Sequence, residues 1–184
     1  MKPVSRPLHR RLSPWLAAPL ILFAVTGMTY RIGRSWFGMS KDVGHQVLDF
    51  HTGMALGKGA SLAYTSIVGL GLMALVISGA ALLWKSRAKQ GVRQWHRIVA
   101  WMLVLPLFAS ATTGILHHYG ELVFGFEKET QSLLMTIHQG NWLGPKGRPF
   151  YILWVGLGLL TLVVTGLSML RRKTSVTAPK ASAS

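Results

Sequence analysis

The chain has no cysteine and very few acidic residues. Without cysteine it has no means of forming disulfides, thiolate-bound metal sites or iron–sulfur clusters. Asp and Glu number only five, against 20 Lys and Arg, and no pair of acids or nucleophile constellation recommends a hydrolase. What remains is a chain of 184 residues, half of them hydrophobic, in which seven histidines are the main candidate ligands.

Four apolar stretches are long enough to cross a hydrocarbon core of about 30 Å, which takes roughly 20 helical residues. They are residues 12–33, 63–84, 99–119 and 150–170. We therefore predict an all-α membrane protein, a four-transmembrane-helix bundle that forms a single membrane domain over 1–184. The end of the chain, 174–184, is rich in Ser, Thr and Ala, and its composition predicts a disordered tail.

The formal net charge of +15 is unevenly distributed. The segments before the first span, between the second and third, and after the fourth carry basic residues and no acid, whereas the other two loops hold all five acids. The positive-inside rule then predicts that both termini are cytoplasmic. The positive-inside rule and contact with the lipid bilayer explain the excess of basic residues, so no nucleic acid is expected as a partner.

The sequence repeats itself at a constant offset of 87 residues, and 26 of the 79 aligned pairs are identical. Repeat one covers 8–86 and repeat two covers 95–173. Because each repeat holds two spans, both cross the membrane in the same direction, which predicts two parallel two-helix repeats related by a pseudo-two-fold axis along the membrane normal. Short interfacial helices are expected on the outer side, over 41–55 and 127–139.

Four of the seven histidines recur in both repeats. His9 and His96 open spans at the cytoplasmic boundary, and His51 and His138 precede spans on the outer side. On the pseudo-symmetry argument the members of each pair face each other. Two opposed neutral imidazoles in an apolar shell are what a bis-histidine haem requires, so the four residues are candidate ligands of haem iron.

Two other kinds of recurring residue accompany these histidines. Gly27 and Gly114 would let a macrocycle approach the backbone closely. Arg10 and Arg97 each follow a candidate ligand and could bind haem propionates through a forked guanidinium contact. Their place is also typical of ordinary positive-inside residues, and that is the explanation we favour for the two arginines.

Three histidines, His45, His117 and His118, have no counterpart in the other repeat, and all lie on the outer side. At the offset of 87 they align with Ser132, Tyr30 and Arg31. They are alternative ligands: one of them could replace an outer haem ligand, or they could hold a metal ion. They could equally be interfacial polar residues that close a helix end.

Each repeat has His-Arg at the start of one span, Thr-Gly near its end, then His-x-Gly-x-x-Leu-Gly, and a second span ending in Ser-Gly or Thr-Gly before Trp-Lys or Arg-Arg. This pattern resembles the PepSY-associated transmembrane family, which includes bacterial inner-membrane siderophore and iron reductases with b-type haems. The resemblance implies His9, His51, His96 and His138 as haem ligands, two haems b, and a multi-pass protein of the bacterial inner membrane. Larger members carry a periplasmic PepSY domain, for which the outer loops here are too short.

The leading hypothesis is an oxidoreductase, a cytochrome b that passes electrons across the membrane. Its donor would be cytoplasmic or a quinol, and its acceptor would be periplasmic, such as the iron of a ferric siderophore. Two alternatives stay open. The chain could be a haem-free membrane adaptor or regulator whose duplication serves helix packing, or a metal or haem transporter that uses the outer histidines.

Overall fold

A computed structural model of the protein describes residues 5–84 and 90–176, with side chains up to Leu170. All regular secondary structure in this part of the chain is helical, and four helices are long and apolar enough to cross a membrane by their length and composition. They are α1 (Ser5–Trp36), α3 (Lys58–Leu83), α4 (Val92–Tyr119) and α6 (Gly144–Val176). The all-α membrane class with four candidate spans is thus confirmed.

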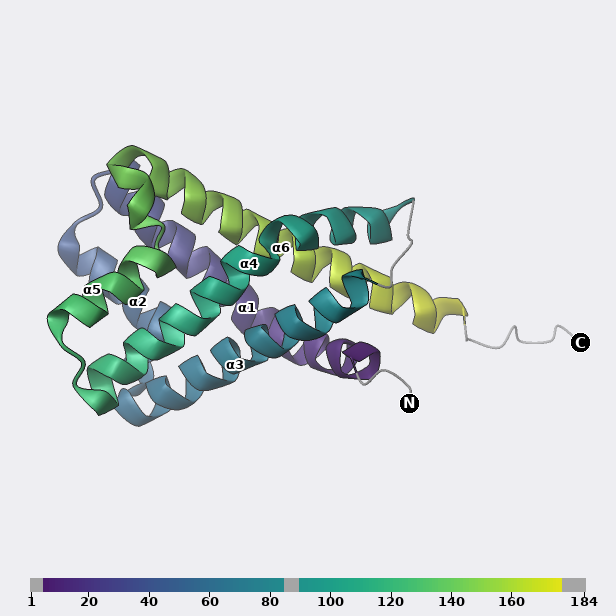
Figure 1. Cartoon of the computed structure of the whole chain (residues 1–184), viewed down its shortest axis with the longest axis horizontal. Coiled ribbons are helices and arrows are strands. Elements are labelled where there is room, and N and C mark those ends of the chain that lie inside the picture. Colours follow the sequence, from purple (N-terminus) through teal and green to yellow (C-terminus); the bar gives the residue numbers. More distant parts are fainter. Residues whose placement is uncertain (1–4, 85–89, 177–184) are drawn as a thin grey trace, which may run out of the picture.

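The four long helices form one bundle, in which α3 and α4 cross α1 and α6 (Figure 1). The start of α1, the end of α3, the start of α4 and the end of α6 lie at one end of the bundle. The opposite end carries two short helices, α2 (Lys41–Thr52) and α5 (Lys128–His138). The loops that contain the acids are therefore at the end away from both termini, as the charge distribution predicts.

The short helices end where a glycine adopts a left-handed backbone. The helix expected over 41–55 stops at Thr52 because Gly53 has a φ of 76°, and a 3-10 turn, η1 (Met54–Leu56), follows it. The helix expected over 127–139 runs from Lys128 to His138, and Gly140, with a φ of 68°, precedes the turn η3 (Asn141–Leu143). Only glycine adopts such angles without steric cost, so the two loops reverse in the same way.

The spans extend beyond the apolar stretches seen in the sequence. α1 begins at Ser5 rather than at residue 12, which places His9 inside the helix, and a π-helical turn, η2 (Gly120–Phe124), prolongs α4. α6 continues to Val176, so the expected tail begins at least three residues later than 174. The rest of that tail, 177–184, and part of the basic link between the second and third spans, 85–89, lie outside the described residues.

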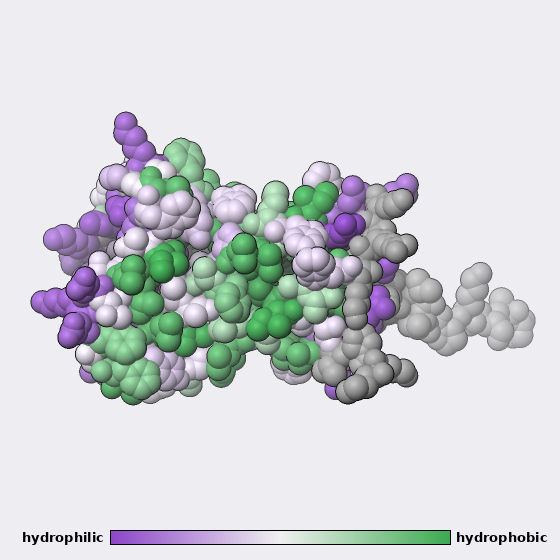
Figure 2. Space-filling model, viewed as in Figure 1, coloured by the Kyte–Doolittle hydropathy of each residue, from purple (hydrophilic) through white to green (hydrophobic). Residues whose placement is uncertain are grey.

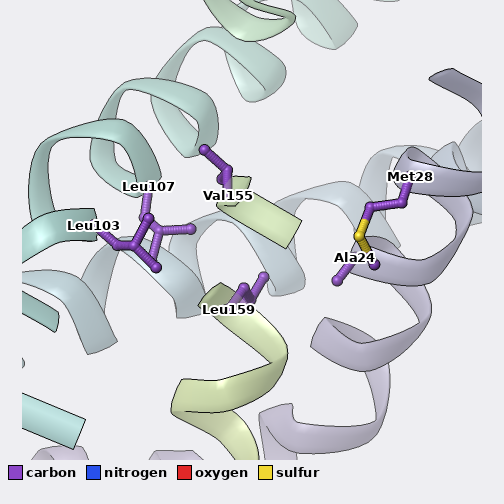
Figure 3. Packing of buried hydrophobic residues seen from close by; sticks show 6 residues of the cluster. All are labelled: Ala24, Met28, Leu103, Leu107, Val155 and Leu159. Carbon is purple, nitrogen blue, oxygen red and sulfur yellow. The ribbon is translucent and has the colours of Figure 1, made fainter. Parts of the chain in front are cut away.

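The core sits between α1, α4 and α6. Ala24 and Met28 of α1 face four buried side chains of the other two helices, Leu103, Leu107, Val155 and Leu159 (Figure 3). A smaller cluster joins α1 to α3 through Leu16, Leu20 and Val68. These contacts fix the four spans relative to one another and thereby position the histidines.

The outside of the bundle is apolar across its middle. Figure 2 shows a hydrophobic band across the middle of the molecule, with hydrophilic residues gathered toward the two ends. Large apolar side chains on this surface are well exposed, among them Trp15 at 84% and Leu105 at 76%. Such a surface is unfavourable in water and typical of helices that face lipid.

Candidate functional site: four tethered histidines

His9 and His96 lie near the starts of α1 and α4, and each ring is bonded to a second spanning helix. Nδ1 of His9 lies 3.1 Å from the carbonyl oxygen of Leu75 and 3.0 Å from Oγ of Ser78, both on α3. Nδ1 of His96 lies 2.8 Å from Oγ1 of Thr165 on α6. Ser78 and Thr165 are also 87 residues apart, so the two histidines have matching partners.

His51 and His138 are attached in the same manner at the other end. Nδ1 of His51 lies 3.0 Å from Oγ1 of Thr26 on α1, and Nδ1 of His138 donates to the carbonyl oxygen of Ser110 on α4 over 2.9 Å. Although His51 is well separated in sequence from the next span, α2 folds back so that its ring reaches the side of α1. The rings of His51 and His138 therefore pack against the long helices, although their loops are long.

The hydrogen-bond network assigns the tautomer of these rings. A carbonyl oxygen can only accept, which makes Nδ1 of His9 and of His138 the donor. The three hydroxyl groups have already committed their own hydrogens to carbonyls one helical turn earlier, so they too accept from the ring. Those bonds are Ser78 to Ala74, Thr165 to Thr161 and Thr26 to Leu22, each at 2.6 Å.

Nε2 of all four rings therefore carries the free lone pair of a neutral imidazole. Within residues 5–84 and 90–170, none of the four Nε2 atoms forms a hydrogen bond. Metal-binding histidines in proteins show this arrangement, because a second hydrogen bond at Nδ1 fixes the ring orientation and raises the basicity of Nε2.

A recurring glycine makes room for each ring. A Cβ atom added at Gly114 would come within 2.9 Å of Cε1 of His138, and one at Gly27 within 3.2 Å of Cε1 of His51. The corresponding distance is 3.2 Å from Gly79 to His9 and 3.7 Å from Gly166 to His96. Gly27 and Gly114, expected to face a macrocycle, thus face imidazole rings.

A cavity of about 720 Å³ separates the four long helices at the end near the termini. Both His9 and His96 line it, and most of the other lining residues are Leu, Val and Ala. The volume is in the range of sites that take a cofactor or another small organic molecule. The two rings therefore border one space that is large enough to hold a ligand between them.

Four arginines line the same cavity: Arg6, Arg10, Arg93 and Arg97. Arg10 and Arg97 were candidates from the sequence, whereas the sequence analysis missed Arg6 and Arg93. Arg6 and Arg93 are also 87 residues apart, so extending the repeat alignment by two residues toward the N-terminus would have found them. No acidic residue is among the described residues that line this cavity, which favours an anionic ligand.

Burial lowers the pKa of both outer histidines. The pKa of His51 falls to about 3, because the ring is desolvated and because a charge on His138 would repel its own; a hydrogen bond to the backbone of Phe23 opposes this only in part. Desolvation also lowers the pKa of His138, against the bond to Ser110, and His117 adds to the lowering. Both rings are consequently neutral at pH 7, the form in which imidazole binds metals.

The three unpaired histidines are placed differently. His45 is exposed on α2, and Nδ1 of His117 lies 3.9 Å from a carboxylate oxygen of Glu121. His118 is buried, with its Nε2 2.8 Å from Oγ of Ser61. In the described part of the chain no three His, Asp or Glu side chains gather as a metal-ion site.

No protein-family model, no curated protein and no solved structure matches this chain. The functional interpretation therefore depends on the geometry of the four tethered histidines.

Proposed function

We propose that the protein is a transmembrane b-type cytochrome that binds two haems b, one between His9 and His96 and one between His51 and His138. One observation carries the proposal. Each of the four recurring histidines gives its Nδ1–H to a neighbouring helix and keeps Nε2 free. This is the arrangement that axial haem ligands need.

The number of ligands favours haem over a bare metal ion. A protein site for zinc or a similar ion uses three or four side chains, and the described residues contain no cluster of three. A haem would need only two ligands from the protein, because the porphyrin would supply the remaining nitrogen ligands to the iron. Two imidazoles on a largely apolar cavity of about 720 Å³ fit that demand.

The charge of the cavity supports the same ligand. Haem carries two propionates, and the four arginines around His9 and His96 offer planar donor groups that suit carboxylates. The apolar side chains between them would exclude water from the faces of the ring. The recurring Arg6, Arg10, Arg93 and Arg97 are then propionate partners as well as positive-inside residues.

The two histidine pairs lie toward opposite ends of the bundle, one near the starts of α1 and α4 and the other on the short helices. Haem iron supplies reversible one-electron transfer, and the protein supplies ligation, spacing and burial. We propose that electrons enter at the end with the termini, from a cytoplasmic or quinol donor. They leave at the outer end to a periplasmic acceptor such as ferric siderophore iron. We also propose that the protein lies in the inner membrane and is related to PepSY-associated reductases.

The decisive test is the haem content and the reduced-minus-oxidised spectrum of the full chain purified in detergent. We expect two haems per polypeptide, with the low-spin signature of bis-imidazole iron. A variant with all four recurring histidines changed to Ala should be colourless, and the exposed His45→Ala should match the wild type. A folded, colourless wild-type protein that takes up no added haem would refute the proposal.

A further inference from the structure

The outer end of the bundle holds two contacts that occupy equivalent places in the two halves and differ in chemistry. In the first, Nε2–H of His118 on α4 donates to Ser61 Oγ over 2.8 Å, and Ser61 donates in turn to the carbonyl of Thr52 over 2.7 Å. Thr52 is the last residue of α2 and follows His51. This contact is neutral, and each of its hydrogens has an acceptor.

At the offset of 87 the same three places are taken by Arg31, Arg148 and Gln139. Arg31 on α1 donates through Nη2 to Oε1 of Gln139, the residue after His138. Arg148 on α6 donates through Nη1 to Oδ1 of Asn141 over 3.4 Å. A histidine and a serine in one half are thus replaced by two guanidinium groups in the other.

The guanidinium groups of the buried Arg31 and the half-buried Arg148 are not fully compensated. Arg31 is only 7% exposed, and the Nε atoms of Arg31 and Arg148 are both buried with no hydrogen-bond partner among the described residues. The two groups are close enough for their charges to interact. None of the ion pairs formed within the described part of the chain, which holds all five acids, involves either arginine.

A buried charge is strongly unfavourable unless it is paired, and Arg stays protonated under all ordinary conditions. Neutral partners such as Gln139 and Asn141 accept hydrogen bonds but leave two positive charges uncancelled. Gln139 and Asn141, the partners of the two arginines, are two residues apart in the chain, so the two guanidinium groups gather at one turn, where they can bind an anionic oxygen group in a forked geometry.

We propose that Arg31 and Arg148 form an anion site that binds a carboxylate or phosphate group beside the outer histidine pair. Two sources share this chemistry. One is a propionate of a haem held by His51 and His138, and this source rests on the function proposed above. The other is the phosphate of a membrane lipid, which does not require haem.

The test compares matched ligands that differ only in the anionic group. In one arm, protohaem and its dimethyl ester are titrated into protein carrying His9→Ala and His96→Ala, so that only the outer pair takes part. In the other arm, binding of phosphatidic acid and of the corresponding diacylglycerol to the detergent-solubilised full chain is compared by native mass spectrometry. Each arm is run with and without Arg31→Gln/Arg148→Gln.

We expect one arm to show about a tenfold or greater preference for the anionic ligand, which the double substitution abolishes. Loss in the haem arm identifies the propionate, and loss in the lipid arm identifies the phosphate. Arg31→His/Arg148→Ser, which introduces the pair found in the other half, should behave like the Gln variant and keep the fold. His118→Gln, in the neutral contact, should leave the preference intact.

The site is refuted if the wild type shows no preference in either arm, or if the arginine variants keep the preference. A haem arm without any haem binding refutes the proposed outer haem, and the lipid arm alone then decides the anion site. The two proposals can therefore fail separately.

Discussion

His9 and His96 stand on the spanning helices, whereas His51 and His138 stand on short helices outside the spans. The inner rings reach forward to the next span of their own half, α3 or α6, and the outer rings reach back to the span that precedes them, α1 or α4. The rings are thus held in the same way at both ends, although the partner helix follows the histidine in the chain at one end and precedes it at the other. They should respond alike to changes at the rings and differently to changes in the supporting elements.

The largest effect should come from removing one ring at each end. We expect His96→Ala and His138→Ala each to lose one of two haems, about half of the total, because each iron needs both axial ligands. Haem per polypeptide and the spectrum of the remaining haem measure this. If either substitution empties both ends, the ends are not independent and the comparison fails.

Acid should destabilise the haem-free protein in part through the outer pair. The folded pKa of His51, about 3, lies below the unfolded value of about 6.5, so the unfolded chain takes up the proton first. The contribution of this ring to stability is complete above pH 6.5 and declines as the pH falls toward 3. Its slope reaches at most about 1.4 kcal/mol per pH unit, and the lowered pKa of His138 acts in the same direction.

Unfolding free energies in denaturant between pH 4 and pH 7 test this slope. His51→Gln/His138→Gln should flatten it, and the exposed His45→Gln should not. An unchanged slope in the double variant would mean that other groups govern the acid response.

Gly→Ala substitutions should test how closely each histidine ring packs against its glycine. Gly114→Ala places a Cβ 2.9 Å from the His138 ring, which is too close, and overpacking of this kind costs about 1–3 kcal/mol. Gly166→Ala places it 3.7 Å from the His96 ring, an ordinary contact, and should gain up to about 1 kcal/mol from helix propensity. Opposite signs of the change in unfolding free energy are expected, and equal effects would contradict the ring positions.

The smallest effect should come from removing one acceptor. Thr165→Val deletes the hydroxyl that accepts from Nδ1 of His96, at a cost of about 1 kcal/mol in haem affinity and with a shift in the midpoint potential of the inner haem alone. Thr161→Val, one turn earlier on the exposed side of α6, is the matched control. A shift in the midpoint potential of the outer haem instead would mean that the two spectra had been assigned to the wrong histidine pairs.

The fold was predictable because its signals are local. Apolar length identified the four spans, and charge distribution separated the two kinds of loop. The helix bounds were less predictable: Gly53 ends α2 three residues early, and the polar residues from Ser5 onward join α1 because the helix extends past its apolar part.

The four histidines of the candidate site were predictable from the sequence. The residues that hydrogen-bond to their rings or leave room for them were less predictable. Ser78-Gly79 and Thr165-Gly166 are hydroxyl–glycine pairs, in which one residue accepts the ring hydrogen and the next leaves room for the ring, yet the sequence alone shows only that they recur. Arg31 illustrates the limit. Its neighbour Arg148 is distant in sequence, and their charges interact only once α1 and α6 have packed.

The hydrogen bonds that hold the histidine rings also bear on the order in which the helices of this protein assemble. His9 and His51 take their partners from within residues 5–84, and neither needs the second half of the chain. Since chains emerge from the ribosome N-terminus first and folded units form in that order, both rings can be set in place before α4 exists. A ligand coordinated by one histidine from each half would then join two helical hairpins that had already formed.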